Sequence, residues 1–386
     1  MTERSEDLNP GPRPPAPGPQ SLFLMAGGGT GGHVIPALAV ARELRQRGHE
    51  VFFVGTAKGI EAKLVPAEGF DLKLIDIGGL NRVGMRQKIA TLSRLPFATA
   101  HCARLLRGVS AVFSMGGYAA GPPVMAALVS RVPVVVMEPN AVPGFTNRII
   151  GRFVYRALVS FPETAAFFPE GKTEIAGLPV RREFFSVPPK PPGGPLTVLV
   201  TGGSQGSRTL NRAVRESWPL FSRAGMPLRI ILQTGPAALA DLRAAFAETG
   251  LEGEVVPFIQ NMPAAFAAAD LVVCRSGAGS VSELAAAGKP SVLVPFPFAA
   301  DDHQTRNAEV MQGGGAARLV PDAEMTGERF FSLVSELTHS PETLTRMGEA
   351  ARKFAKPGAA RRAAGILEEA AERFRLTAAS QAGTIR

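Results

Sequence analysis

Cysteine is scarce in this sequence of 386 residues, and so are side-chain patterns that usually hold a metal ion. The two cysteines, Cys102 and Cys274, are far apart, which excludes a disulfide framework and favours a reducing compartment. Paired acids of the form Asp-x-Asp do not occur. The adjacent Asp301, Asp302 and His303 leave a metal site as an alternative, but the sequence favours a mechanism with no metal and no other cofactor.

Long apolar segments are also lacking. The longest uncharged stretch, residues 108–130, contains Pro122, Pro123 and four glycines, whereas a membrane-spanning helix needs about 20 mostly apolar residues. We therefore predict a strand, a glycine loop and a helix in this stretch, and only peripheral contact with a membrane. The first ten residues are charged and have no apolar core, so no secretory signal is expected.

Acidic residues are fewer than basic ones, at 33 against 42, and the net charge of +9 favours anionic partners such as phosphorylated substrates or acidic lipid. A nucleic-acid-binding protein would interleave aromatic residues with a basic stripe, but the single tryptophan and the two tyrosines are isolated. We therefore expect no nucleic-acid partner and keep this class as an alternative. A salt-dependent gel shift with generic DNA would support it.

Proline and glycine are abundant, and they divide the chain. Residues 1–20 contain six prolines and predict a disordered tail, while a second proline-rich stretch at 187–195 predicts a stiff linker. After each stretch an apolar run, at 21–26 and at 196–200, leads into a glycine-rich turn and a segment with helical spacing. Further apolar runs alternate with helical segments, which predicts two doubly wound α/β domains with parallel sheets. The cleft between two such domains is a natural ligand site.

The first glycine turn matches the pattern G-x-G-x-x-G at Gly27, Gly29 and Gly32. A dinucleotide-binding enzyme would need an acidic residue at the end of the next strand, but residues 54–56 are Val-Gly-Thr. A nicotinamide cofactor is therefore disfavoured. What remains is a bare backbone at a helix N-terminus, which favours an anionic ligand.

His33 lies where the first predicted helix begins. The positive end of the helix dipole disfavours the imidazolium form, so we expect a neutral side chain that can accept a proton near pH 7. The alternative is a histidine that only caps the loop by hydrogen bonding.

A run of small residues at 274–280 follows the strand predicted at 270–274 and leads into a helix predicted at 281–287. Its backbone N–H groups and hydroxyls can bind a pyrophosphate. Glu283 is expected in the first turn of this helix, where a carboxylate can act as a ligand contact or merely as a capping group. Cys274 is expected to be an inert strand residue.

Seven segments, in the same order, resemble the MurG family of glycosyltransferases. They are 28–39 (GGTGGHVIPALA), 115–118 (MGGY), 138–144 (EPNAVPG), 178–181 (LPVR), 202–206 (GGSQG), 274–278 (CRSGA) and 302–307 (DHQTRN). The resemblance covers roughly residues 21–370. Leu178 departs from it, because the family commonly has asparagine there.

The resemblance implies a GT-B fold, in which two Rossmann-like domains face each other across a cleft. Residues 21–186, completed by a C-terminal helix at about 358–378, would form the acceptor and membrane-associating domain. After the linker at 187–195, residues 196–357 would form the UDP-sugar domain.

The implied reaction is inverting transfer of N-acetylglucosamine from UDP-N-acetylglucosamine to the 4-hydroxyl of the muramyl sugar in undecaprenyl-pyrophosphoryl-N-acetylmuramyl-pentapeptide. The alternative is a related enzyme with another lipid acceptor, such as diacylglycerol. Residues 115–118 and 138–140 favour the muramyl acceptor. The resemblance also implies partners among other cell-wall and division proteins.

Carried over by position, the UDP-N-acetylglucosamine contacts would be Thr30, Gly31, Gly32, Asn140, Arg181, Ser204, Ile259, Ala278, Gly279, Ser280, Val281, Ser282, Glu283 and Gln304. Glu283 would accept hydrogen bonds from the ribose hydroxyls, and Gln304 would read the sugar. We expect His33 to be the general base, with Glu138 and His303 as alternatives.

Residues 82–107 contain no acid and six basic side chains: Arg82, Arg86, Lys88, Arg94, Arg104 and Arg107. Apolar residues lie between them, and Pro96 is expected to break any single helix. We predict peripheral binding to anionic lipid on the cytoplasmic face of the bacterial cell membrane, through Arg86, Lys88 and Arg94. The alternative is an ordinary solvated basic face.

Overall fold

The computed structural model describes residues 20–78, 84–191 and 193–383. The tail predicted at residues 1–20 lies outside these residues except for Gln20, and Arg82 lies outside them as well.

The first half of the chain forms a seven-stranded sheet with the order β3-β2-β1-β4-β5-β6-β7, in which all pairs are parallel. Its strands are β1 (Leu22–Gly27), β2 (Glu50–Gly55), β3 (Asp71–Leu74), β4 (Val109–Gly116), β5 (Val134–Glu138), β6 (Arg156–Val159) and β7 (Thr173–Ile175). The helices of this half are α1 (Gly31–Gln46), α2 (Glu61–Ala67), α3 (Met85–Leu105), α4 (Gly121–Val129) and α5 (Phe145–Ile150). Because helices cover both faces, the central strands are continuous apolar runs that are fully buried, as in residues 23–26.

The second half forms a six-stranded parallel sheet with the order β10-β9-β8-β11-β12-β13. Its strands are β8 (Leu196–Thr201), β9 (Leu228–Gln233), β10 (Glu252–Val256), β11 (Leu271–Cys274), β12 (Ser291–Leu293) and β13 (Ala317–Leu319). Helix α6 (Arg182–Phe185) precedes the first strand of this sheet, and the helices of the second half are α7 (Arg208–Ala224), α8 (Leu239–Ala247), α9 (Met262–Ala268), α10 (Ala278–Ala287), α11 (His303–Gly313), α12 (Gly327–Thr338) and α13 (Pro341–Lys353). The prediction of two doubly wound parallel sheets is confirmed.

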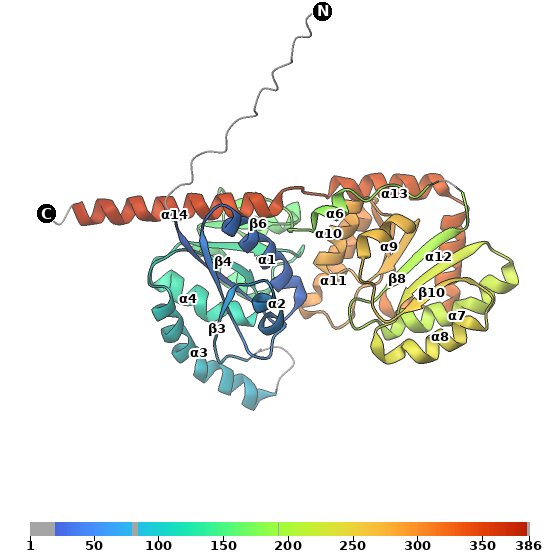
Figure 1. The fold of residues 1–386 in the computed structure, drawn as a ribbon, viewed down its shortest axis with the longest axis horizontal. Coiled ribbons are helices and arrows are strands. Elements are labelled where there is room, and N and C mark those ends of the chain that lie inside the picture. The colour runs from blue at the N-terminus through green and yellow to red at the C-terminus, as the bar shows by residue number, and fades with distance from the viewer. Residues whose placement is uncertain (1–19, 79–83, 192, 384–386) are drawn as a thin grey trace, which may run out of the picture.

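The last helix, α14 (Ala359–Gly383), returns from the second sheet to the first (Figure 1). Ala363, Ile366 and Leu367 are completely buried and share one apolar core with β1 and β4. The first half of the chain therefore needs this late segment to close its core.

Both sheets reverse their strand order at one place, between β1 and β4 in the first and between β8 and β11 in the second. In sheets of this type ligands bind outside the carboxyl ends of the strands at such a reversal. The glycine segments at 27–29, 116–117, 202–206 and 277–279 all follow these four strands. The fold therefore gathers the glycine loops at two ligand-binding edges.

Two predicted elements differ from the structure. Helix α3 is continuous from Met85 to Leu105, although Pro96 was expected to break it. Proline removes one backbone hydrogen bond, and the remaining bonds of a 21-residue helix that also packs on α4 maintain it. Helix α10 begins at Ala278, three residues before the predicted start, because Gly277 takes the extended N-cap conformation.

The uncharged stretch at 108–130 forms β4, a short 3-10 turn at Tyr118–Ala120 and α4, as predicted. Within the described ranges, the helices are too short or too polar to cross a bilayer.

Candidate functional site

His33 lies in the first turn of α1, directly after the glycine loop that follows β1. Thr30, the N-cap, and Gly31 and Gly32 form the exposed or partly exposed start of this helix. The Nδ1 atom of His33 lies 3.2 Å from the Gly28 carbonyl oxygen. Because a carbonyl can only accept, Nδ1 carries the proton in this contact and Nε2 is left as an acceptor.

The electrostatic surroundings of His33 favour the neutral ring. Burial lowers its pKa, the Gly28 carbonyl opposes this, and the charge of His303 on α11 lowers the pKa further. The net direction is downward, which agrees with the neutral side chain expected from the sequence. Its first cause, however, is burial rather than the helix dipole.

A second glycine loop approaches His33 from the end of β4. Gly116 and Gly117 have φ angles of 77° and 79°, which favour glycine. A Cβ atom at Gly117 would lie 3.2 Å from His33 Nδ1, so a side chain here would press against the imidazole. The motif at 115–118 is thus next to the candidate base.

Glu138 is buried at the end of β5, and its carboxylate accepts four hydrogen bonds. The donors are Asn140 N (3.0 Å) and Nδ2 (3.1 Å), Gly144 N (3.0 Å) and Asn147 Nδ2 (3.0 Å). Burial raises the pKa of Glu138, and these N–H donors oppose the rise. Both oxygens are occupied, so the carboxylate organises the turn at 138–144 and is poorly placed to act as the alternative base.

Asn307, a buried residue of α11, joins the two halves of the molecule. Its Oδ1 accepts from Ala141 N (2.9 Å), and its Nδ2 donates to Asn140 Oδ1 (3.2 Å) and to the Ser276 carbonyl (3.1 Å). Asn140, an expected sugar-nucleotide contact, therefore lies at the junction between the turn at 138–144 and α11.

Gln233 connects the two segments of the second half that contain Ser204 and Ile259, both of which are expected to contact UDP-N-acetylglucosamine. Ser204 is exposed in the glycine loop after β8, and Ile259 lies in the segment after β10. The buried Gln233 donates from Nε2 to the Gly203 carbonyl (2.8 Å) and accepts from Ile259 N (3.0 Å). One side chain thus fixes the position of both segments.

Glu283 is the sixth residue of α10 rather than part of its first turn, because the helix begins at Ala278. The prediction that it lies in the first turn is wrong, and the capping alternative loses its basis. Glu283 Oε1 lies 3.6 Å from Arg181 Nη2, and the Arg181 guanidinium lies 4.9 Å from the centre of the Phe184 ring. Burial raises the pKa of Glu283 to about 7, and Arg181 opposes the rise. The two side chains meet at the junction between the halves.

The first residues of α10 differ in their exposure to solvent. Ala278, Gly279, Ser280 and Ser282 are partly exposed, whereas the Val281 side chain is buried and its N–H donates to the Gly277 carbonyl (3.0 Å). The helix N-terminus therefore presents the N–H groups before Val281.

Gln304 lies on α11 beside this helix start. Its side-chain Oε1 accepts from Phe296 N (3.0 Å), and its carbonyl accepts from Ser276 Oγ (2.8 Å). Arg275 is held by Asp322 and by the Val294 and Pro295 carbonyls (each 3.0 Å). Burial raises the pKa of the neighbouring Cys274 to about 12, which fits an inert thiol.

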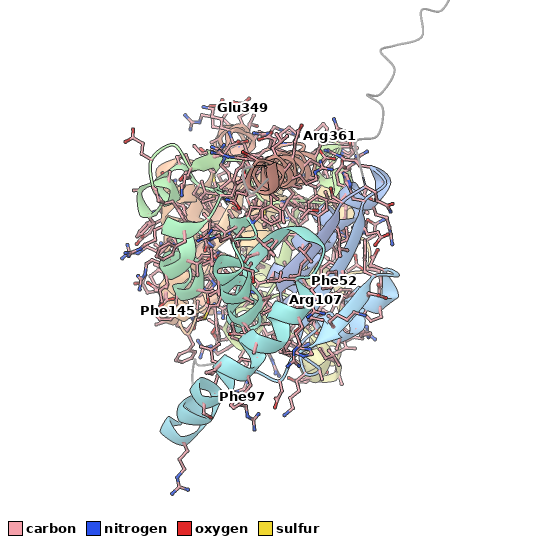
Figure 2. All side chains as sticks on the ribbon, turned by 90° about the vertical axis from the view of Figure 1, so that its left-hand side faces the viewer. Phe52, Phe97, Arg107, Phe145, Glu349 and Arg361 are labelled. Atoms are coloured by element: carbon pink, nitrogen blue, oxygen red, sulfur yellow. The ribbon has the colours of Figure 1, made fainter. Side chains whose placement is uncertain are left out.

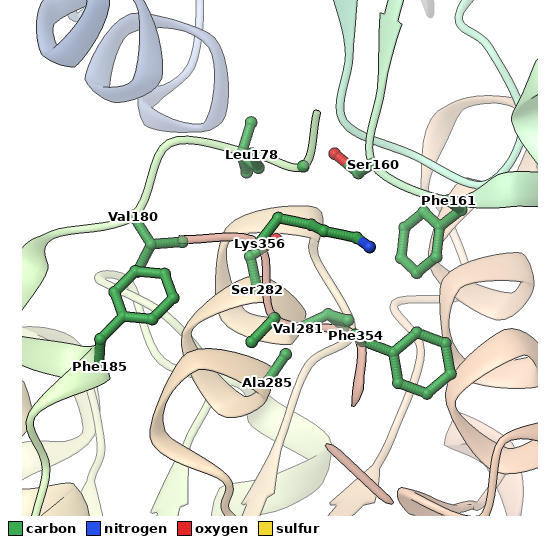
Figure 3. Close-up of a pocket in the computed structure, with 12 residues that line it drawn as sticks. Ser160, Phe161, Leu178, Val180, Phe185, Val281, Ser282, Ala285, Phe354 and Lys356 are labelled. Carbon is green, nitrogen blue, oxygen red and sulfur yellow. The ribbon is translucent and has the colours of Figure 1, made fainter. Parts of the chain in front are cut away.

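A small cavity lies behind α10, where the two chain crossings between the sheets meet (Figure 3). Leu178 and Lys356 line it from the crossings, and Val281 lines it from α10. Its volume of about 20 Å³ suits a water molecule and not a nucleotide. Gly177 packs so closely on Lys356 that a Cβ would lie 2.3 Å from the lysine Cβ. This cavity therefore has no room for a nucleotide.

The three basic residues expected at the membrane lie on α3. Arg86 is exposed, and Arg94 Nη1 forms an ion pair with Asp76 Oδ2 at 3.0 Å. The side chain of Lys88 lies outside what the structure describes. Residues 82–107 contain no acid, but Asp76, which precedes this segment in the sequence, lies beside Arg94 in the structure.

Sequence reasoning missed four buried polar residues: Glu61, Asn147, Gln233 and Asn307. Each hydrogen-bonds a backbone group of a glycine loop or of a turn at the site, or another site side chain. For Gln233 the available signal was a polar residue at the end of an apolar run, LRIILQ, whereas the other three lie among polar or small residues and give no such signal. Among the described residues, no cluster of three or more His, Cys, Asp or Glu side chains is arranged to hold a metal ion.

Comparison with known proteins agrees with this arrangement. Residues 23–159 match the glycosyltransferase family 28 N-terminal domain, and residues 197–363 match the glycosyltransferase family 28 C-terminal domain. The UDP-N-acetylglucosamine–N-acetylmuramyl-(pentapeptide) pyrophosphoryl-undecaprenol N-acetylglucosamine transferase of Solibacter usitatus is 73% identical over 90% of this chain and 96% of that protein. The transferase of the same name from Myxococcus xanthus is 41% identical over 89% of this chain and 91% of that protein.

A solved structure shows the same relationship in three dimensions. The crystal structure of MurG from Acinetobacter baumannii is 34% identical, with a TM-score of 0.77, over 90% of this chain and 99% of that one. The resemblance inferred from the sequence motifs is confirmed. The chain belongs to glycosyltransferase family 28 and, within it, to the MurG N-acetylglucosamine transferases.

Proposed function

We propose that this chain transfers N-acetylglucosamine from UDP-N-acetylglucosamine to the 4-hydroxyl of the muramyl sugar in undecaprenyl-pyrophosphoryl-N-acetylmuramyl-pentapeptide. The observation that carries the proposal is the paired arrangement of the two sheet edges. At the first edge lies His33, whose Nδ1 binds the Gly28 carbonyl so that Nε2 can accept a proton. At the second edge lies the partly exposed N-terminus of α10, with Glu283 and Arg181 beside it. The names of the 73% and 41% identical relatives supply the donor and the acceptor.

The second domain, residues 196–357, binds the donor in this proposal. The N–H groups at the start of α10 face the diphosphate, because a helix N-terminus carries partial positive charge. Glu283 accepts from the ribose hydroxyls, Gln304 contacts the sugar, and Ser204 and Ile259 complete the pocket. As the bond to the sugar breaks, the same N–H groups stabilise the charge that develops on the leaving UDP.

The first domain, residues 21–186 together with α14, presents the acceptor. His33 Nε2 removes the proton from the 4-hydroxyl while that oxygen attacks the anomeric carbon. The bond between this carbon and the UDP oxygen breaks on the opposite side, so the configuration inverts and a β-1,4 linkage forms. A positioned base of this kind typically contributes roughly 10²–10⁴-fold to the rate.

The acceptor is a lipid, and the first domain carries an exposed apolar surface that suits a membrane. Phe97 is 80% exposed on α3, Val129 is 83% exposed at the end of α4, and Phe153 is 63% exposed after α5. Figure 2 shows Phe97 at the lower end of the first domain and Phe145 at the left edge of the same view. Arg86, Arg94, Arg148 and Arg152 are exposed on the same elements or beside them. We infer peripheral binding at the cytoplasmic face of the cell membrane through apolar insertion and attraction to anionic lipid.

The reaction is tested by transfer of labelled sugar from UDP-N-acetylglucosamine to a purified lipid-linked muramyl-pentapeptide, with and without EDTA. We expect a β-1,4-linked product in both conditions, because the donor site relies on a helix N-terminus rather than on paired acids. Loss of activity in EDTA that Mg²⁺ restores would contradict the metal-free mechanism. A second reaction with diacylglycerol as acceptor tests the choice of acceptor, and faster transfer to it would overturn that choice.

A further inference from the structure

Glu61, the first residue of α2, is a fully buried carboxylate at the edge of the first sheet. Its Oε1 accepts from Thr56 N and Thr56 Oγ1, each at 2.9 Å, and its Oε2 accepts from Gly29 N at 2.8 Å. Thr56 follows β2, whereas Gly29 follows β1, so this one side chain connects the loops after two neighbouring strands. A buried carboxylate is costly unless such donors satisfy it.

Three glycines leave the space that this carboxylate fills. A Cβ atom would lie 2.4 Å from Glu61 Oε1 if placed at Gly28, 2.5 Å from Cγ at Gly55 and 2.0 Å from Oε2 at Gly59. The missing side chain at Gly28 therefore leaves room for the Glu61 carboxylate, although the glycine pattern alone suggests that the room is for a ligand. The loop after β1 takes its shape from Glu61.

The same loop holds the candidate base. Gly28 provides the carbonyl that binds His33 Nδ1 at 3.2 Å, and Gly29 is the residue whose N–H binds Glu61. Gly29 has a φ of 88° and packs against the Tyr118 ring, whose hydroxyl lies 3.3 Å from Thr56 Oγ1. Glu61, Thr56 and Tyr118 thus enclose the two-residue segment that orients the imidazole.

We propose that Glu61 is a positioning residue of the transfer reaction: it fixes the turn at Gly28 and Gly29, and thereby sets the tautomer and orientation of His33. This inference rests on the proposed function, in which His33 Nε2 accepts the proton of the acceptor hydroxyl. Glu61 reaches no substrate itself, and its effect passes through the Gly28 carbonyl and through its own negative charge.

The negative charge of Glu61 shifts the pKa of His33, and the sign of this shift can be measured. The charged or titratable groups that act on the pKa of His33 are Glu61, which raises it, and His303, which lowers it. Removal of the Glu61 charge therefore lowers the pKa of His33. The neutral, proton-accepting form then persists to lower pH, and the acidic limb of the pH–rate profile moves to lower pH.

The test compares Glu61→Gln with the wild-type protein in the sugar-transfer assay. We expect kcat to fall at least about tenfold, since misorientation of a general base affects the chemical step. The KM for UDP-N-acetylglucosamine should change far less than kcat, because most of the proposed donor contacts lie in the second domain. The acidic limb should move to lower pH. Glu61→Asp keeps the charge but cannot reach both loops, so we expect a smaller loss of kcat and an acidic limb near that of the wild type.

Two further variants separate positioning from general stability. Glu68→Gln is the matched control, because Glu68 follows the other end of α2 and pairs with Arg42 at 2.6 Å, away from the glycine loop. We expect wild-type kcat and an unchanged pH profile for it. In a His33→Ala background, Glu61→Gln should cause no further loss, because the residue through which it acts has been removed.

Wild-type kcat and pH profile in Glu61→Gln that still binds UDP would overturn the inference, and so would an additive loss in the His33→Ala background. If Glu61→Gln does not fold, Glu61→Asp decides the matter by kcat: a lower kcat with an unchanged acidic limb supports positioning, and wild-type kcat overturns it. Failure of the wild-type protein to transfer sugar would instead disprove the proposed function.

Discussion

His33 is fixed at one ring nitrogen by the Gly28 carbonyl, and no side chain at Gly117 crowds the ring. We predict that His33→Ala lowers kcat by roughly 10²–10⁴-fold, because the acceptor hydroxyl loses its base. The dissociation constant for UDP should change far less, since the N–H groups proposed to bind the diphosphate lie on α10. Steady-state kinetics together with calorimetry measure both quantities.

His339→Ala is the control for this experiment, since His339 is exposed after α12 and its Nδ1 is bonded to the Ser335 carbonyl. Equal losses in UDP binding and in rate for His33→Ala would make His33 a ground-state ligand contact rather than a base.

The Glu283 carboxylate can bind either Arg181 or, in the proposed complex, the ribose hydroxyls. With Arg181 at 3.6 Å as a weak partner and a pKa raised to about 7, the carboxylate has capacity for the ribose hydroxyls. Loss of such charge-assisted hydrogen bonds costs about 1.5–3 kcal/mol. Glu283→Ala should therefore weaken UDP binding roughly tenfold to a hundredfold and raise the donor KM similarly.

Calorimetric titration of UDP checks the effect of Glu283→Ala. Glu309→Ala is the control, because Glu309 is an exposed acid on the neighbouring α11 that pairs with Arg306. Unchanged UDP affinity in folded Glu283→Ala would show that the carboxylate serves only the protein.

At the scale of single elements, helix α3 and the end of α4 form the surface that we expect to meet the membrane. Replacement of Arg86, Lys88 and Arg94 by glutamine should reduce sedimentation with anionic vesicles, because each basic side chain near the surface contributes about 1 kcal/mol. Phe97→Ser should reduce it as well, even at high salt, because it removes apolar insertion instead of charge. UDP affinity should remain intact in both variants.

A matched control removes the same charge from α7 in the second domain, where Arg212, Arg215 and Arg223 are exposed. If this triple glutamine variant loses as much vesicle binding as the α3 variant, the effect is one of net charge and the membrane surface lies elsewhere.

The sequence predicted strands better than it predicted helix ends or polar contacts. Buried parallel strands are short apolar runs, so β8 and β11 were located within one residue of their observed ends. Helix starts depend on local conformation, such as the extended Gly277 that begins α10. Glu61 binds Gly29 across 32 residues of sequence, and Asn307 binds Ala141 across 166 residues. No local pattern encodes such contacts, because they exist only once the strands are ordered.

At the scale of the whole molecule, Asn307 joins the two domains. Asn307→Ala removes its bonds to Ala141 and Asn140 and leaves a buried N–H without its acceptor, which costs about 1–3 kcal/mol. We expect lower thermal stability, and a calorimetric transition that broadens or splits as the domains unfold with less coupling. Gln312→Ala, on the same helix but bonded within the second domain to Leu319 N, should leave the transition single. A single, unshifted transition in Asn307→Ala would contradict a joining role.

Helix α14 also has a consequence for how the protein is made. The first domain leaves the ribosome early, but Ala363, Ile366 and Leu367, which close its core, are synthesised after the entire second domain. The roughly 170 intervening residues take roughly 10 to 35 s at ~5–20 residues per second. Throughout that time the nascent first domain lacks α14 and the apolar contacts that this helix makes, whereas the core of the second domain uses no residue of α14.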